Sequence, residues 1–396
     1  MTKNSLKNGP DELGYYGEGE SAMGGMAVGE TLMPALHELN LAFEDAIKDK
    51  AFLDEFAYYC KHYIGRPSPL YHAENLSNKL GGAKILFKQE HLNHTGSHKI
   101  TNSLFQVLLA KRMGKKNLIC ESGAGQHYSA TAAVAAKFGI PLIGVMGEVD
   151  IKRVNQNIIK AKHYGAKLKA VPGTLKEAIT DAIKTWITNP DYYYVCGSAV
   201  SSFPFPKIVQ FAQSIIGKEI REQCLEQEKK LPNMIIGCVG GGSNFIGSIH
   251  EFLDEPNIKK IGVEAAETAA LTHGTPNIMQ GMKSYMLASS DGSKSLGGSS
   301  LGAGIQYFGV GPQHSYLKDQ GAVTYTLATD KEILNAYKVV AQTEGISSAL
   351  EPMAAAAEVL KQAKGKPKDF IIVLSLCGRG EKDLDTIEEH MGKDFE

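Results

Sequence analysis

Lys99 is the residue whose type and position most directly indicate chemistry. It follows His98 in "HTGSHKITN" (94–102), between a strand-like run (83–90) and a run with helical spacing (99–114). A lysine at a helix start feels the positive end of the helix dipole, which disfavours its charged form, and a neutral amine can attack a carbonyl. The alternative is a solvated first-turn lysine, the usual place for this residue type.

A phosphate cradle is predicted at "GCVGGGSNFIG" (237–247). There a buried strand runs into three glycines, followed by Ser243 and Asn244 at the start of a helix. Bare amides at a helix start can bind a phosphate. The order of the glycines matches neither the dinucleotide nor the nucleoside triphosphate motif. A tight structural turn is the alternative interpretation.

Two further strand ends carry polar or reactive residues. In "ESGAGQHYS" (121–129), Glu121 could act as a general acid or base, and the following amides could bind a carboxylate. In "LCGRG" (376–380), Cys377 ends a strand. Taken alone, the first is equally an ordinary loop and the second a small buried hydrophobe. Together with the amine and the phosphate cradle, they match the needs of pyridoxal 5′-phosphate (PLP) acting on an amino acid.

The elements that must position these residues alternate between strand and helix. Strand-like runs at 117–122, 141–147, 166–172 and 192–198 are separated by helical runs. The same alternation of helices and strands continues after residue 205. Glycine marks the joints. This pattern is typical of parallel sheets covered by helices on both faces, here as two α/β lobes with a shared cleft. Residues 205–227 are predicted to form one long helix.

Composition narrows the possible partners and location. The net charge of the 396-residue chain is −1, which gives no sign of nucleic acid or an anionic membrane as a main partner. The six cysteines form no C-x-x-C pair, which favours a reducing cytoplasm over a disulfide framework or a structural zinc site. The first twenty residues lack the apolar core of a signal peptide, and no apolar run approaches the roughly 20 residues that span a bilayer.

Long motifs over nearly the whole chain resemble the tryptophan synthase β-chain family, of PLP fold type II. They stand in the family's order: "GGMAVGETLMPALHEL" (24–39), "GRPSPLYHAENL" (65–76), "LNHTGSHKITN" (92–102), "ESGAGQH" (121–127), "GGGSN" (240–244), "GVGPQHSYLKD" (309–319) and "SLCGRGEKD" (375–383). The resemblance implies two α/β lobes, each a largely parallel sheet flanked by helices, with the cofactor in the cleft between them. The N-terminal lobe would comprise 1–60 and 95–215, with a mobile closing segment at about 114–197, and the C-terminal lobe 61–94 and 216–396.

The resemblance also implies a role for each motif residue. Lys99 would be the Schiff-base lysine, with His98 near the phosphate, and Glu121 the acid–base group. Glu351 would lie near the cofactor ring, and Cys377 would face the pyridine nitrogen. The phosphate would rest on Gly240, Gly241, Gly242, Ser243 and Asn244. The substrate carboxylate would bind Ser122, Gly123, Ala124, Gly125, Gln126 and His127. A monovalent cation, Na⁺ or K⁺, would bind backbone carbonyls near Gly240, Tyr307 and Gly309.

The family's reaction is a PLP-dependent β-replacement, catalysed by a lyase. L-serine loses its hydroxyl to give an aminoacrylate, and indole adds to it to give L-tryptophan. The resemblance further implies a homodimer, and an α chain that makes the indole and passes it through a tunnel.

Four positions depart from the family's pattern. Gln306 stands where the family has an aspartate that pairs with an arginine of the mobile segment, and Tyr128 stands where it usually has glycine, beside the expected acceptor pocket. "SFPFP" (202–206) replaces "HPYP", and Cys377 replaces a serine. The first three changes concern closure and the second substrate. Three alternatives therefore remain: a related enzyme with another acceptor, a serine deaminase acting by β-elimination, and a catalytically silent paralogue that serves as a binding partner.

Overall fold

The chain folds into two compact units, which are interleaved along the sequence. The computed structural model describes residues 6–152, 155–289 and 294–394. Unit 1 is built from Met1–Ala27, Ser68–His91 and Ser198–Glu396, and unit 2 from Val28–Pro67 and Leu92–Gly197. The bounds of the predicted lobes stay a prediction. These units place 1–27 and 198–215 with the C-terminal residues, and 61–67 and 92–94 in unit 2. The predicted closing segment lies within unit 2, and its motion stays a prediction.

Unit 1 is centred on a six-stranded sheet. Its strand order is β13 (Thr324–Ala328), β10 (Lys259–Ala265), β9 (Met234–Cys238), β14 (Ile371–Ser375), β4 (Lys84–Lys88) and β3 (Leu70–His72). All neighbouring pairs are parallel except β3 with β4. Every residue of β9 and β14 is buried, as expected for apolar strands covered on both faces.

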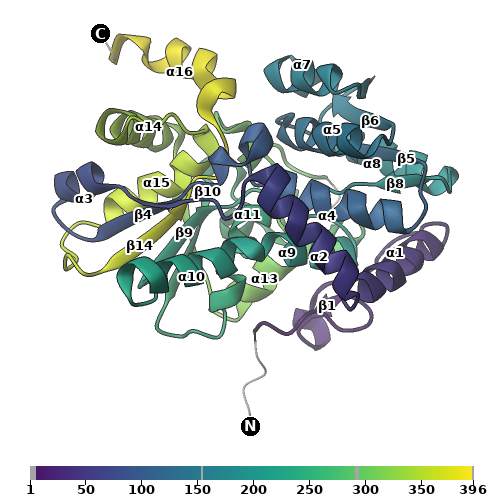
Figure 1. Ribbon diagram of the computed structural model, residues 1–396, viewed down its shortest axis with the longest axis horizontal. Helices are drawn as coiled ribbons and strands as arrows, with labels where there is room; N and C mark the ends of the chain where they lie inside the picture. The colour runs from purple at the N-terminus through teal and green to yellow at the C-terminus, as the bar shows by residue number, and fades with distance from the viewer. Residues whose placement is uncertain (1–5, 153–154, 290–293, 395–396) are drawn as a thin grey trace. The chain divides into compact units, whose positions relative to one another are not determined.

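Helices cover both faces of this sheet (Figure 1). Neighbouring residues of one strand enter different cores: Ile236 packs in one and Ile235 in the other. The first core includes α3 (Glu74–Leu80), α14 (Asp330–Glu344), α15 (Leu350–Gln362) and α16 (Leu384–Met391). The second includes α10 (Ile215–Glu228), α11 (Ser243–Ile249) and α13 (Pro312–Asp319).

The prediction of one long helix over 205–227 is wrong. The structure has α9 (Phe205–Gln213) and α10, which meet at Ser214. The hydroxyl of Ser214 donates to the carbonyl of Phe211 at 2.7 Å, a side-chain bond that competes with helix geometry. Unit 1 also contains α12 (Ala270–His273) and a small antiparallel sheet of β1 (Tyr15–Tyr16), β2 (Met23–Gly24), β12 (Met282–Met286) and β11 (Thr275–Met279).

Unit 2 is centred on a four-stranded parallel sheet. The strand order is β7 (Lys167–Val171), β6 (Leu142–Gly147), β5 (Asn117–Glu121) and β8 (Tyr192–Tyr194). Its helices are α1 (Met33–Ala46), α2 (Lys50–Tyr59), α4 (Lys99–Arg112), α5 (Gln126–Phe138), α6 (Glu148–Ile151), α7 (Asn155–His163) and α8 (Leu175–Thr188). Two mainly parallel sheets flanked by helices confirm the α/β prediction.

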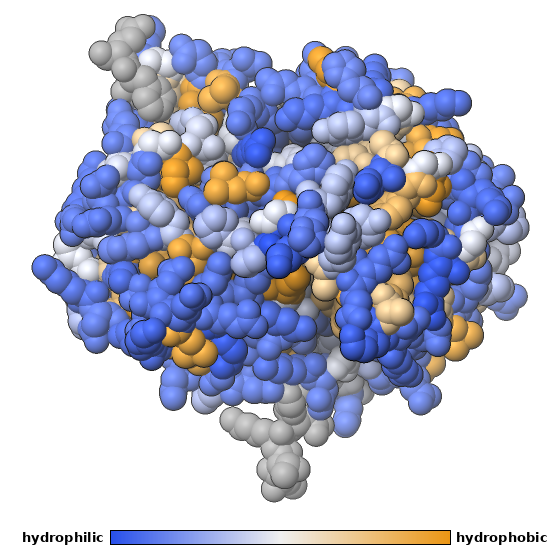
Figure 2. All heavy atoms as spheres, viewed as in Figure 1, coloured by the Kyte–Doolittle hydropathy of each residue, from blue (hydrophilic) through white to orange (hydrophobic). Residues whose placement is uncertain are grey.

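Hydrophilic residues cover most of the face shown in Figure 2, and the hydrophobic residues on it form small groups. Over the described ranges, no helix combines the length and the apolarity needed to cross a membrane.

Candidate active site

Lys99 is the first residue of α4, directly after the buried His98. Its ammonium is held rather than solvated, because Nζ donates to the carbonyl of Gly197 at 2.5 Å. The amide of the same Gly197 donates to Oε1 of Glu121 at 3.1 Å. Gly197, three residues after the end of β8, therefore hydrogen-bonds both the amine and the carboxylate that the sequence analysis identified.

Glu121 ends β5 and is 4% exposed. Burial raises its pKa above the ordinary value, against hydrogen bonds from Tyr194 and the Gly197 amide and the positive charge of Lys99. Its Oε2 has no hydrogen-bond partner within the described part of the chain. A buried carboxyl with a raised pKa and an unpartnered oxygen is suited to proton transfer.

Gly197 must be glycine because the His127 ring lies against it. A Cβ on Gly197 would stand 2.4 Å from Cδ2 of His127. The His127 Nε2 lies 2.8 Å from the carbonyl of Val195. Burial and the charge of Lys99 lower the pKa of His127 to about 3, so its imidazole is neutral and Nε2–H donates to that carbonyl. The imidazole thus supports the chain after β8, and carboxylate binding by His127 stays a prediction that would use its backbone.

Asn102 and Gln106 both hydrogen-bond the backbone of Cys196, the residue before Gly197. The sequence analysis did not identify these two residues. Both are fully buried. The Cys196 carbonyl accepts from Asn102 Nδ2 at 2.8 Å and from Gln106 Nε2 at 2.7 Å, and its amide donates to Gln106 Oε1 at 2.9 Å. The available signal was spacing, since polar residues three and seven positions after Lys99 share its helix face.

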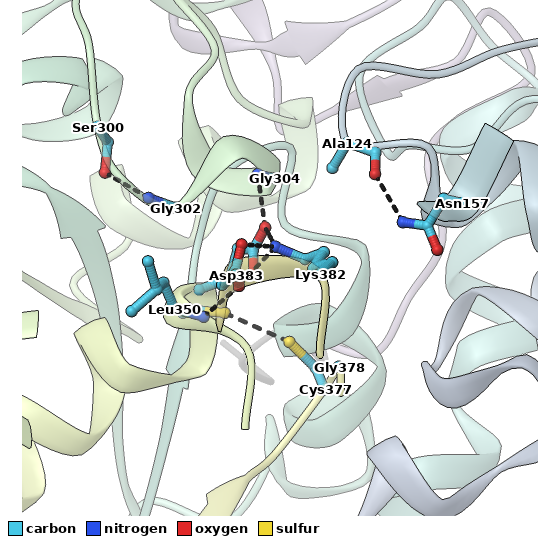
Figure 3. A network of polar contacts seen from close by, with 12 residues as sticks. Ala124, Asn157, Ser300, Gly302, Gly304, Leu350, Cys377, Gly378, Lys382 and Asp383 are labelled. Atoms are coloured by element: carbon cyan, nitrogen blue, oxygen red, sulfur yellow. Dashed lines mark hydrogen bonds and ion pairs between the residues drawn. The ribbon is translucent and has the colours of Figure 1, made fainter. Parts of the chain in front are cut away.

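The predicted carboxylate nest is the turn into α5. Gly125 adopts a φ of +72°, a left-handed conformation that favours glycine, and Asn157 Nδ2 donates to the Ala124 carbonyl at 2.9 Å (Figure 3). Three residues after Gly125, the fully buried ring of Tyr128 packs against β6, where a Cβ on Gly144 would be 2.2 Å away. Tyr128 thus fills the core between α5 and the sheet. Its place beside an acceptor pocket stays a prediction.

In unit 1, the three-glycine turn after β9 leaves no room for side chains. A Cβ on Gly240 would lie 2.7 Å from a backbone oxygen, and one on Gly241 would lie 2.0 Å from the Ser198 hydroxyl. Gly242 has a φ of +91°, and its Cβ would meet the His314 ring at 2.2 Å. His314 also holds the turn, because its Nε2 lies 2.8 Å from the Gly242 carbonyl.

Asn244 offers a buried donor beside this turn. Its Oδ1 accepts from the Ser375 hydroxyl at 3.0 Å, which leaves Nδ2 without a partner among the residues described. Asn244 is 4% exposed and Ser243, which begins α11, is equally buried. A phosphate group can bind the exposed amides of a glycine turn and a buried amide donor that lacks a partner. These residues of unit 1 therefore fit the phosphate of PLP.

Glu351, in the first turn of α15, belongs to a buried charged cluster with Lys382 and Asp383, the two residues of the cluster that Figure 3 labels. Its Oε1 accepts from the Gly304 amide at 2.7 Å and from Lys382 Nζ at 2.9 Å. Burial opposes ionisation of this carboxyl, but the charge of Lys382 lowers its pKa, whereas burial raises the pKa of Asp383. Glu351 Oε2 has no hydrogen-bond partner over the described ranges.

The remaining predicted site residues also lie in unit 1. Cys377 follows β14, and its Sγ is 3.6 Å from that of Cys238. Gln306 donates from Nε2 to the Gly298 carbonyl at 3.1 Å. Near the predicted cation ligand Tyr307, Gly309 forms an isolated bridge with Met286.

Comparison with known proteins identifies the class. The model of the family described as pyridoxal-phosphate dependent enzyme matches residues 62–378, and the chain belongs to that family. Within it, the chain is 48% identical over 401 residues to the tryptophan synthase beta chain of Allorhizobium ampelinum, covering 98% of both chains. The predicted resemblance is thereby confirmed: this is a PLP-dependent enzyme of the tryptophan synthase β type.

Proposed function

We propose that this chain joins L-serine to indole by β-replacement and releases L-tryptophan. The observation that carries the proposal is the Gly197 peptide, which holds Lys99 Nζ on one side and Glu121 Oε1 on the other. A PLP enzyme that exchanges a β-substituent needs an amine for the cofactor aldehyde and a proton carrier close to it. Similarity over 98% of a tryptophan synthase beta chain supports the same assignment.

PLP, when bound, supplies an electron sink for the substrate's α-carbon. Lys99 would hold the cofactor aldehyde through Nζ and would carry a proton to and from that carbon. Glu121 holds a proton on its unpartnered Oε2, gives it to the departing serine hydroxyl and takes one from the incoming indole. The raised pKa of Glu121, which follows from its burial, suits a group that must both give and accept a proton.

The unit 1 residues orient the cofactor. The Gly240–Gly242 turn, Ser243 and Asn244 would bind its phosphate through backbone amides and the Asn244 Nδ2 donor. His98 is the neighbour of the phosphate that the resemblance implies. Cys377 would face the pyridine nitrogen as a weak donor, and Glu351 would lie near the ring. Backbone carbonyls near Gly240, Tyr307 and Gly309 bind Na⁺ or K⁺.

The residues from Ser122 to His127 bind the serine carboxylate, and Tyr128 and Gln306 shape the site for the second substrate. Gln306 is tied to the Gly298 carbonyl within its own unit, and a neutral amide cannot form the ion pair that its family position would provide. Closure of the segment at about 114–197 therefore depends on other contacts in this chain.

Product analysis with serine alone and with serine plus indole tests the proposal. We expect tryptophan to be the main product when indole is present, with little pyruvate. Pyruvate and ammonia as the main products in the presence of indole would instead identify a serine deaminase. Tryptophan-like adducts formed only with other nucleophiles would identify a different acceptor. A protein that does not bind PLP would be a silent paralogue.

The assembly and location are part of the same proposal. The protein works as a homodimer in the cytoplasm, and it accepts indole from a tryptophan synthase α chain. Sedimentation of the purified protein with and without an α chain tests both the homodimer and the binding of the α chain. A monomer that does not bind the α chain would contradict the proposal.

A further inference from the structure

Cys238 and Cys377 are two thiols in direct contact. Their sulfur atoms lie 3.6 Å apart at the carboxyl ends of β9 and β14, which are neighbouring parallel strands. Each is 5% exposed, whereas the other four cysteines are 0–2% exposed. The pair therefore combines the closest approach of two thiols with the best access for a small reagent among the chain's six cysteines.

We propose that Cys238 and Cys377 form a redox-active pair, and that their oxidation to a disulfide weakens cofactor binding. With a hydroperoxide as oxidant, the two thiols lose two electrons and two protons and one Sγ–Sγ bond forms. With hydrogen peroxide, the O–O bond breaks and two water molecules carry away the protons and electrons. The effect on the cofactor rests on the function proposed above, whereas the disulfide itself does not.

Bond formation requires the sulfurs to approach from 3.6 Å to about 2.05 Å, a change that rotation about the Cα–Cβ bonds and a small backbone shift must supply. The backbone at both positions is held. Leu376 donates from its amide to the Lys88 carbonyl at 2.9 Å, and the Val239 amide donates to the Val263 carbonyl at 2.8 Å. The strain therefore falls beyond these held residues, on the turn that begins at Gly240 and on the chain after Cys377.

On the Cys238 side, that segment is the three-glycine turn. Its clearances are small, since even a Cβ on Gly241 would stand 2.0 Å from the Ser198 hydroxyl, and Gly241 also accepts from the Gly311 amide at 3.1 Å. A shift of a few tenths of an ångström would misplace amides that must converge on a phosphate. On the other side, the disulfide removes the S–H of Cys377, the donor assigned to the pyridine nitrogen.

Peptide mapping of the oxidised holoenzyme tests the disulfide. Trypsin releases Cys238 within residues 231–259 and Cys377 within residues 369–379, and each peptide contains a single cysteine. After treatment with hydrogen peroxide and alkylation of the remaining thiols, we expect these two peptides to be linked, with two hydrogens lost. Dithiothreitol should separate them. Absence of the linked pair would overturn the proposal.

Cofactor binding is measured on the same samples by dialysis and PLP absorbance. We expect oxidation to weaken PLP binding about tenfold, reversibly with dithiothreitol. Cys377→Ser and Cys238→Ser should each lose the linked peptide and the effect of peroxide, and the control Cys224→Ser, a buried cysteine of unit 1, should retain both. A linked pair with unchanged PLP binding would overturn the proposed effect. Failure of the reduced protein to bind PLP would refute the proposed function, while the linked peptides would still decide the disulfide.

Discussion

Replacing Gln106 with leucine tests whether the clamp on Cys196 positions the catalytic pair. Gln106→Leu removes three buried hydrogen bonds: two with the Cys196 amide and carbonyl, and a third from Nε2 to Asn102 Oδ1 at 2.8 Å. The Cys196 carbonyl keeps Asn102 Nδ2, so two groups, the Cys196 amide and Asn102 Oδ1, lose this partner. At roughly 1–3 kcal/mol for each buried unsatisfied group, the variant should lose about 2–6 kcal/mol of stability.

The functional effect should be separable from the loss of stability. Because Gly197 follows Cys196 and contacts both Lys99 and Glu121, its displacement should lower kcat by about 100-fold, with PLP still bound. Steady-state kinetics well below the unfolding temperature, together with PLP titration, measure this. The control Gln362→Leu removes one bond on a partly exposed helix face and should leave kcat unchanged. A destabilised Gln106→Leu protein with normal kcat would refute the positioning argument.

Three further predictions concern the single residues Glu121, Gly242 and His314. Glu121→Gln should lower kcat by about 10²–10⁴-fold while PLP remains bound, and unchanged kinetics would remove Glu121 from the mechanism. Gly242→Ala should weaken PLP binding in dialysis, because its φ of +91° and the His314 ring exclude a Cβ; normal affinity would contradict the phosphate cradle. Burial lowers the pKa of His314 to about 4, whereas an unfolded histidine takes up its proton near pH 6.5. The unfolded state thus binds more protons between these values, and the free energy of unfolding should fall by about 3 kcal/mol as the pH drops from 6.5 to 4. Urea unfolding across this range should show a shallower dependence in His314→Gln, and identical slopes would argue against a neutral buried His314.

The sequence predicted most of the framework that carries the site. The strand expected at 83–90 is β4, the helix expected at 99–114 is α4, and the strand expected at 117–122 is β5. These elements have clear apolar periodicity or short apolar runs with glycine at their ends, and such local signals survive folding. The prediction of one helix over 205–227 failed at a single residue, Ser214, where α9 and α10 meet and the hydroxyl donates to the Phe211 carbonyl. Apolar spacing does not register such a side-chain bond.

The site itself was only partly predictable. Lys99 and Glu121 are marked by residue type and position, but the Gly197 that contacts both lies 98 residues after Lys99 and 76 after Glu121. Tyr128 is a second residue whose contacts the sequence could not predict. Its bulk predicts a changed acceptor pocket, which stays a prediction, but its contact with Gly144 of β6 could not be read from the sequence because it joins two separate elements. Contacts of this kind follow from tertiary packing and leave no local pattern.

Borohydride reduction of the PLP-loaded protein, followed by peptide mapping, tests the central claim most directly. Reduction makes a lysine–pyridoxal linkage permanent, so the labelled lysine can be identified by mass spectrometry. The contact of Lys99 with Gly197 predicts a single pyridoxyl group on Lys99 and none in Lys99→Ala. A label on another lysine, or no label on a protein that binds PLP, would contradict the account.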